Sequence, residues 1–441
     1  MKILLASTAS HVPPRGGSTR SNLVWLDHVA SRGHECRIVC AAAVNDTPER
    51  NALVEREMTE QQIEATPARA SIDVVTFQRG PITVQSVTDA TKQRTVLHDE
   101  IRNFQPDWVL VSSEDLGHVL LREADASARG RVVYIAHTPQ FFPFGPASWN
   151  PDAHATELVA RCAGVIAIGH HMADYIHKYC GVQPAVIHPP IYGSEPFERL
   201  GRFGEGYVTM VNPCAVKGIS IFLALAKLHL EFSFAALPGW GTTRSDRQAL
   251  ASIPNVTVLP HCKQIEQCLR QTRILLVPSL WYEGFGLIAM EALLRGIPVV
   301  SSDSGGLKEA KHGTHYVIPV RPIEKYEPVF DEQRMPRPVI PDQDLAPWSA
   351  ALKALSIDRV EYDREADDSQ RAALAFVRGL KAERFEEYLL NLNRATASTP
   401  ATMDPDAIVG QAFSKLSPEK RELLLRRLKK QTPKPANDRT S

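Results

Sequence analysis

Two acidic residues, Glu283 and Glu291, stand eight positions apart in the segment PSLWYEGFGLIAMEA. The residues that follow the first acid directly are Gly284, Phe285, Gly286 and Leu287. Small residues before a helix let backbone N–H groups approach an anion, and the positive end of the helix favours its charge. The carboxylates would repel that anion, so they are suited to accept hydrogen bonds from hydroxyl groups. The segment therefore predicts a site for a ligand that carries both phosphate and polyol.

The interval between the two acids also has a geometric interpretation. If Glu283 lies in a loop and Glu291 lies just over one turn into a helix, both face one cleft at different depths, as the two sugars of a nucleotide sugar would require. The segment resembles the paired-glutamate motif of retaining GT-B glycosyltransferases, family 4 in particular. The alternative is a solvated helix whose N-terminal glutamate only supports the helix dipole.

Composition limits the classes of function. The 441 residues are 44% hydrophobic and 23% charged, which suits two globular domains with ample cores. Fifty basic residues balance 50 acidic ones, so no global field attracts nucleic acid or an anionic membrane. The seven cysteines include no Cys-x-x-Cys pair, and the first apolar run is shorter than a signal-peptide core. We therefore expect reduced thiols and a cytoplasmic protein.

Apolar runs alternate with helical segments along most of the chain, which predicts an α/β fold with doubly wound parallel sheets. A first series of strands is expected within residues 2–7, 35–42, 71–77, 107–113, 131–137, 164–169 and 184–190, with a helix at 19–32. A second series is expected within residues 207–212, 233–239, 256–260, 273–279 and 297–302.

The resemblance covers about residues 1–392 and implies the GT-B architecture, with two Rossmann-like domains facing across a cleft. The expected division is an acceptor-binding domain, a linker, a nucleotide-sugar-binding domain, a terminal helix that crosses back to the first domain, and a linker with a basic amphipathic tail: 1–190, 191–206, 207–367, 368–392 and 393–441. Ligands of such sheets lie beyond the carboxyl ends of the strands.

Residues of the first domain that follow strands are candidates on this ground. Gly16 and Gly17 precede a helix, and the resemblance implies contacts from them to the donor phosphate or the acceptor, the alternative being a simple tight turn. His137 resembles the active-site histidine of the family, which implies that it bonds a sugar hydroxyl or stabilises positive charge at the anomeric carbon through its carbonyl. The alternative is a histidine that only caps a helix or fills the core. The aromatic residues Phe141, Phe142 and Phe144 form an acceptor wall or only pack their loop.

In the second domain, Lys217 begins a helix after a strand and would give a compact positive charge to the diphosphate leaving group. The resemblance implies an arginine a few residues earlier, but this chain has Val211, Asn212 and Pro213 there. Either Asn212 donates a weaker hydrogen bond, or another cation such as Arg244 replaces the arginine.

Two further segments match the family by position. His261 and Cys262 lie where relatives hold the nucleotide base between backbone groups. Gly305, Gly306 and Glu309 follow the next strand, where they support the phosphate cleft or only begin a helix.

The resemblance implies neither a metal nor another cofactor, because the nucleoside diphosphate sugar is a substrate. Asp342 and Asp344 have the Asp-x-Asp spacing of metal-dependent glycosyltransferases, but their surroundings favour a helix cap. Residues 321–341, with five prolines, are expected to be an insertion loop.

The tail has two candidate partners. Its LSPEKR stretch resembles segments that precede condensation domains of nonribosomal peptide synthetases, which suggests a peptide or polyketide acceptor. Its basic residues instead suit anionic lipid, namely Arg426, Arg427, Lys429 and Lys430.

The predicted function is a retaining, metal-independent transfer of a sugar from a nucleoside diphosphate sugar to an acceptor hydroxyl, with a natural product as one acceptor. A non-catalytic nucleotide-sugar-binding scaffold and a sugar-nucleotide epimerase of the same fold are the alternatives.

Overall fold

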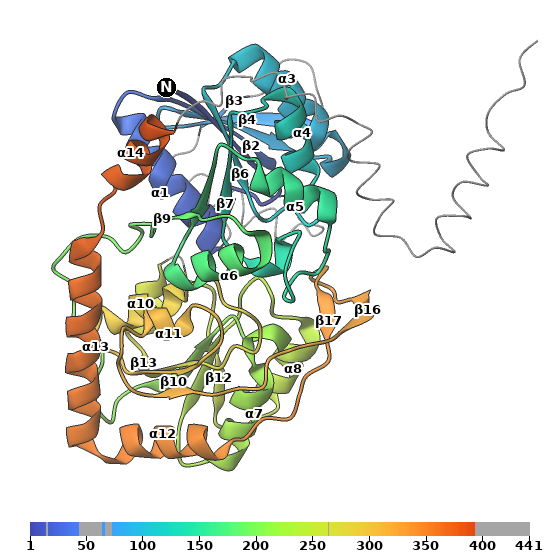
Figure 1. The fold of residues 1–441 in the computed structure, drawn as a ribbon. Coiled ribbons are helices and arrows are strands. Elements are labelled where there is room, and N and C mark those ends of the chain that lie inside the picture. Colours follow the sequence, from blue (N-terminus) through green and yellow to red (C-terminus); the bar gives the residue numbers. More distant parts are fainter. Residues whose placement is uncertain (15, 44–63, 67–72, 263, 393–441) are drawn as a thin grey trace, which may run out of the picture. The chain divides into compact units, whose positions relative to one another are not determined.

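The computed structural model describes residues 1–14, 16–43, 64–66, 73–262 and 264–392. Met1–Arg394 is one compact unit, and it contains both of the large sheets drawn in Figure 1. The expectations about residues 393–441, including the basic tail and its two candidate partners, lie outside the described residues.

The first sheet has nine strands in the order β3-β4-β5-β2-β1-β6-β7-β8-β9. Its strands are β1 (Lys2–Ser7), β2 (Glu35–Ala41), β3 (Glu64–Thr66), β4 (Val74–Arg79), β5 (Ile82–Val87), β6 (Trp108–Ser112), β7 (Val132–Ala136), β8 (Gly164–Ala167) and β9 (Ala185–Val186). Its helices are α1 (Gly17–Ser31), α3 (Gln93–Phe104), α4 (Val119–Ser127), α5 (Ala153–Ala160) and α6 (His170–Cys180), with 3-10 turns η1 (Ala90–Lys92) and η2 (Pro139–Phe141).

One edge of this sheet corrects the expectation of purely parallel pairing. β4 pairs antiparallel with both β3 and β5, whereas β5 joins β2 in parallel. Only Gly80 and Pro81 separate β4 from β5, and a connection of two residues can join only antiparallel strands. The sequence analysis missed β5, although its alternating residues after a Gly-Pro turn are typical of a hairpin strand.

The second sheet has six strands, all parallel, in the order β12-β11-β10-β13-β14-β15. Its strands are β10 (Tyr207–Val211), β11 (Phe234–Leu237), β12 (Val256–Val258), β13 (Thr272–Val277), β14 (Val299–Ser302) and β15 (Val317–Ile318). Its helices are α7 (Ile219–Leu228), α8 (Arg244–Ala251), α9 (Ile265–Leu269), α10 (Leu287–Leu293) and α11 (Leu307–Ala310), with the 3-10 turn η3 (Ala215–Lys217). The predicted α/β class with two doubly wound sheets is confirmed.

Both sheets are buried on both faces, as parallel sheets must be. In β1, Leu5 belongs to one hydrophobic core and Leu4 to another, because neighbouring side chains point to opposite faces. The core that contains Leu5 continues into the second half, where it includes Met290 and Leu293 of α10. Apolar packing therefore joins the two halves beside the second acid, Glu291.

The segment expected to be an insertion loop forms an antiparallel hairpin, β16 (Tyr326–Phe330) with β17 (Pro336–Pro338). After it come α12 (Ala346–Ile357), α13 (Arg359–Gly379) and α14 (Glu383–Asn391). The expected domain boundary between 367 and 368 falls inside α13, and the helix expected over 368–392 is divided between α13 and α14 (Figure 1).

α14 packs against the first half of the chain. The Phe385 ring stacks on Trp25 of α1 with centroids 5.0 Å apart, and Glu386 accepts a hydrogen bond of 2.7 Å from His34. The two final described helices thus connect the second sheet to the first.

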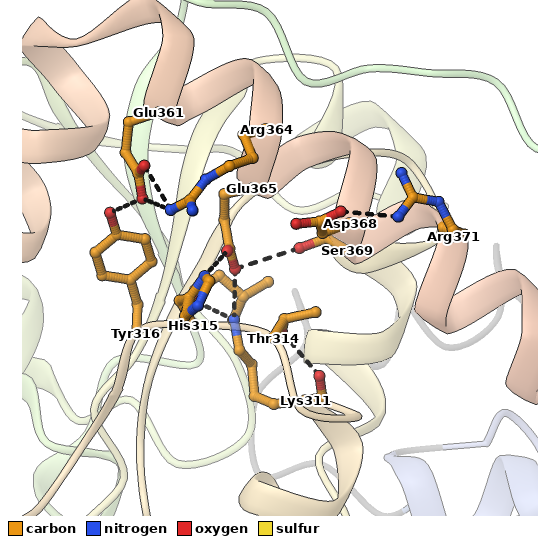
Figure 2. Close-up of polar contacts among 11 residues, drawn as sticks. Lys311, Thr314, His315, Tyr316, Glu361, Arg364, Glu365, Asp368, Ser369 and Arg371 are labelled. Atoms are coloured by element: carbon orange, nitrogen blue, oxygen red, sulfur yellow. Dashed lines mark hydrogen bonds and ion pairs between the residues drawn. The ribbon is translucent and has the colours of Figure 1, made fainter.

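A buried polar cluster fixes α13 to the second half (Figure 2). Lys311 follows α11 and lies 3.3 Å from Glu365 of α13, and neither side chain is exposed to solvent. Lys311 also donates to the carbonyl of Val299 at 2.5 Å, and His315 lies 3.3 Å from the second oxygen of Glu365. Burial lowers the pKa of Lys311 to about 8, against the opposing effect of Glu365.

Among the helices that the structure describes, none combines the length and the apolar character needed to cross a bilayer.

Candidate active site

The first acid of the paired-glutamate segment is paired with a lysine. Lys217 of η3 donates to Glu283 with an N–O distance of 2.5 Å, and its ammonium lies 4.5 Å from the centre of the Trp281 ring. Glu283 accepts a second hydrogen bond of 2.5 Å from Ser279. The loop after β13 and the turn after β10 thus bring their functional groups together at the carboxyl ends of neighbouring strands.

Glu283 is ionised at neutral pH. Burial alone would raise its pKa, but the charge of Lys217 and the hydrogen bonds from Lys217 and Ser279 outweigh burial and lower the pKa. An ionised carboxylate only accepts hydrogen bonds, so it is suited to bind hydroxyl groups of a ligand.

Gly284 has no side chain because another part of the chain occupies that space. A Cβ atom there would lie 2.2 Å from the carbonyl oxygen of His137 at the end of β7. Gly305 and Gly306 also contact the backbone of this loop closely. A Cβ on Gly305 would lie 2.3 Å from the Glu283 carbonyl oxygen, and a Cβ on Gly306 would lie 2.6 Å from the Gly284 carbonyl oxygen. The Gly306 N–H donates to the Glu283 carbonyl oxygen at 2.9 Å. These two glycines therefore position the loop of Glu283.

His137 is buried, and its side chain already has a partner. Its Nε2 lies 2.9 Å from the Asn22 side-chain oxygen, and its backbone N–H donates to Ser113. Burial lowers the pKa of the imidazole, although Glu114 opposes this shift. The imidazole is therefore neutral at pH 7, and the group that His137 presents to Gly284 is its carbonyl.

The second acid, Glu291, lies on α10 with its side chain only 6% exposed. Arg20 of α1 donates to its Oε1 at 2.9 Å, which the sequence analysis did not foresee. Both acids of the motif are thus held by a cation: Glu283 by Lys217 and Glu291 by Arg20.

Gly16 and Gly17 begin α1 close to α10. Gly16 has φ 130°, a conformation that favours glycine, and a Cβ on Gly17 would lie 2.6 Å from the side chain of Leu287. The glycines bring the N-terminus of α1 against the first residue of α10.

Asn212 stands where the expected arginine is absent. It follows β10 with φ 55°, and its Oδ1 accepts from the N–H of Gly241 at 2.9 Å. Its Nδ2 is buried and has no hydrogen-bond partner among the described residues. Arg244, the other candidate, is exposed at the start of α8, where its backbone N–H donates to Glu332.

Comparisons with known proteins identify the family of the chain. Residues 15–192 match the family described as Glycosyltransferase Family 4, and residues 206–326 match the family described as Glycosyl transferases group 1. The chain belongs to the family 4, or group 1, glycosyltransferases.

Solved structures of low sequence identity share the fold of this glycosyltransferase. Sucrose-phosphate synthase from Thermosynechococcus elongatus is 13% identical with a TM-score of 0.61, over 89% of this chain and 98% of that one. HepE from Anabaena, solved in complex with UDP-glucose, is 14% identical with a TM-score of 0.58, over 88% of this chain and 98% of that one. Both likenesses show the GT-B fold.

A curated relative matches a shorter part of the glycosyltransferase. An uncharacterized 42.6 kDa protein in the cps region of Klebsiella pneumoniae is 29% identical over 93 residues, which are 21% of this chain and 25% of the relative.

The aromatic residues expected to form an acceptor wall divide into two groups. Phe142 and Phe144 are buried in the core of the first half, so their burial favours the packing interpretation. Phe141 is partly exposed, and the centre of its ring lies 5.4 Å from that of Trp149. The Trp149 ring centre lies 6.2 Å from that of Trp281, which is beside Lys217. Phe285, between the motif glycines, is buried and stacks on Phe376 of α13.

The remaining candidates lie at the edge of the second sheet or between the halves. His261 is exposed and Cys262 partly buried after β12, where burial raises the pKa of the Cys262 thiol. Glu309 accepts hydrogen bonds from the backbone N–H groups of His170 and His171, at 2.9 and 2.8 Å, which begin α6 in the first half. Glu309 thus connects the two halves of the glycosyltransferase.

No group of three or more His, Cys, Asp or Glu residues that could hold a metal ion occurs in the part of the chain that the structure describes. Asp344 accepts from the N–H of Ala346 at the start of α12.

Three residues that contact the two acids or Lys217 escaped the sequence analysis: Arg20, Ser279 and Trp281. Ser279 and Trp281 lie within four residues of Glu283, so their proximity could have indicated them. Arg20 lies one helical turn after Gly17 and therefore on the same face of α1, which is the signal that could have identified it.

Proposed function

We propose that this family 4 glycosyltransferase moves a sugar from a nucleoside diphosphate sugar to an acceptor hydroxyl with retention of the anomeric configuration and without a metal ion. The donor binds in the second half. Glu291 accepts hydrogen bonds from the ribose and Glu283 from the transferred sugar. Lys217 and backbone N–H groups of Gly284 to Gly286 contact the phosphates.

The observation that carries the proposal is the partly buried ion pair of Lys217 and Glu283, directly beside the contact of the His137 carbonyl with Gly284. A cation, a hydroxyl acceptor and a carbonyl dipole converge there. These are the groups needed at a leaving phosphate, a sugar hydroxyl and an anomeric carbon that becomes positive.

In the proposed reaction the bond between the anomeric carbon and the phosphate oxygen breaks, and the acceptor oxygen bonds to the same face of that carbon. The departing phosphate oxygen takes the proton of the acceptor hydroxyl. Lys217 stabilises the negative charge that develops on the phosphate, which is the role of a metal ion in metal-dependent glycosyltransferases.

In this proposal the first half holds the acceptor, and the LSPEKR stretch of the tail suggests a natural product of peptide or polyketide type as one acceptor class. HepE, which shares the fold, was solved with UDP-glucose, and this supports a nucleoside diphosphate sugar as the donor class. Binding measurements on this protein are needed to identify its preferred base.

The test starts with thermal-shift measurements against UDP, GDP and ADP, since the ligand that binds best stabilises the protein most. With the matching donor, NMR of the first-formed product or of released sugar should show the anomeric configuration of the donor, and EDTA should leave turnover unchanged. Lys217→Ala and Glu283→Gln should each lower kcat/KM by about 100-fold or more while the variants remain folded. Inversion of configuration, or near-normal turnover of either variant, would refute the proposal.

A further inference from the structure

The diphosphate of the donor carries a negative charge on each phosphate, whereas Lys217 is a single cation. The arginine that the family resemblance implies a few residues before this lysine is absent, and Asn212 is neutral. The following inference rests on the proposed function and concerns the source of the second positive charge.

Arg20 is placed to supply it. The residue lies one turn after Gly17 on α1, and Gly17 contacts Leu287 at the start of α10. Its guanidinium now bonds Glu291, four residues further along α10, which corresponds to a rise of about 6 Å. A long, flexible side chain can cover that distance without movement of α1.

Arg20 is now bonded to Glu291, the carboxylate that the proposed function assigns to the ribose of the donor. The Arg20 side chain is 42% exposed, whereas that of Glu291 is 6% exposed. Ribose hydroxyls that donate to Glu291 would replace the guanidinium as its hydrogen-bond donors. The released guanidinium then has a phosphate on the adjacent position of the ligand, and guanidinium binds phosphate with two parallel hydrogen bonds.

The other acid has the same arrangement. Lys217 is bonded to Glu283 as Arg20 is bonded to Glu291, so each carboxylate holds one cation before the donor arrives. Asn212 adds an independent indication of a ligand, because its buried Nδ2 has no partner among the described residues and follows the same strand as Lys217.

We propose that Arg20 is a donor-binding residue that moves from Glu291 to the ribose-proximal phosphate when a nucleoside diphosphate sugar binds, and so replaces the missing arginine from the opposite half of the chain. Lys217 moves correspondingly from Glu283 to the sugar-proximal phosphate.

The test compares the affinities of a nucleoside, its monophosphate and its diphosphate by calorimetry or NMR titration. The probes are the uridine, guanosine or adenosine series that binds the wild-type protein most tightly. Arg20→Gln should weaken the monophosphate and the diphosphate by roughly tenfold or more and change nucleoside affinity by less than about threefold. Lys217→Ala should weaken the diphosphate selectively.

Two further variants keep the result interpretable. Arg20→Gln leaves Glu291 buried without its cation, so the double variant Arg20→Gln/Glu291→Gln removes both charges, and the ratio of monophosphate to nucleoside affinity should fall in it by the same factor. Arg270→Gln breaks an exposed pair with Glu198 and should leave all three affinities unchanged.

Equal losses of affinity for nucleoside, monophosphate and diphosphate in Arg20→Gln would mean that Arg20 only orients Glu291. An unchanged ratio of monophosphate to nucleoside affinity in the double variant would also overturn the inference. The proposed function would stand in both cases. If the wild-type protein binds none of the diphosphates, the proposed function fails as well.

Discussion

Gly284 shows how much a single residue position decides in this protein. The carbonyl oxygen of His137 occupies the space that a side chain at position 284 would fill. The adjacent Glu283 contacts Lys217 only if the backbone of this loop is fixed. The absence of a side chain at Gly284 therefore satisfies both requirements. An extra methyl group would separate the two halves of the site at the point where the chemistry is expected.

We predict that Gly284→Ala lowers the free energy of unfolding by about 1–3 kcal/mol and kcat/KM by more than about tenfold, because Cβ would lie 2.2 Å from the His137 carbonyl oxygen. Urea denaturation and steady-state kinetics measure the two effects. The control is Gly379→Ala, where nothing lies within 4 Å of the added atom, and it should change neither quantity appreciably. Normal activity of Gly284→Ala would mean that this contact has no role in the site.

At the scale of elements, α13 carries residues for two separate purposes. Phe376 stacks on Phe285 between the motif glycines, and Glu365 bonds the buried Lys311 (Figure 2). A buried ion pair costs desolvation that its attraction only partly returns, so it is expected to specify position more than to add stability. The pair therefore sets the register of α13 on the second sheet.

We predict that Lys311→Met alone lowers the free energy of unfolding by about 3–5 kcal/mol, because it leaves Glu365 buried without its lysine. The double variant Lys311→Met/Glu365→Leu should recover most of that loss or exceed the wild-type stability. Chemical denaturation at pH 7 measures both, with Arg371→Met as a control that breaks an exposed pair. A double variant as unstable as the single one would contradict this account.

At the scale of the whole molecule, contacts between the two halves depend on charge as well as on apolar packing. Glu309 of the second half caps α6 of the first and accepts a further hydrogen bond of 3.1 Å from His188. Burial alone would raise the pKa of Glu309, but the hydrogen bonds from His188, His171 and His170 lower it to about 2. The connection between the halves is therefore sensitive to acid.

A carboxyl group whose pKa falls on folding stabilises the native state above its unfolded pKa and loses this effect as the pH falls through its folded pKa. We predict that Glu309→Gln lowers the free energy of unfolding by about 3 kcal/mol at pH 7, and that the difference from wild type shrinks between about pH 4.5 and 2. Denaturation at a series of pH values measures this. Glu205→Gln, on an exposed residue, is the control, and a difference independent of pH would exclude this role for Glu309.

The sequence by itself determined the α/β class, the family resemblance and the two acids with their lysine. Strand periodicity and the residues at strand ends are local properties of the chain, and the carboxyl ends of parallel strands must meet at one edge. The analysis missed the alternating strand 82–87 because the short turn before it decides its pairing. It misplaced the boundaries of the last helices because tertiary packing decides them.

Only the tertiary structure decided which residues contact the acids across the halves. Arg20 and Glu291 are 271 positions apart, and Glu309 is 139 positions from His170 at the start of α6. Phe142 and Phe144 look like Phe141 in sequence, but the first two fill a core and the third does not. Such contacts depend on how whole elements pack, and no local pattern of residue types records that packing.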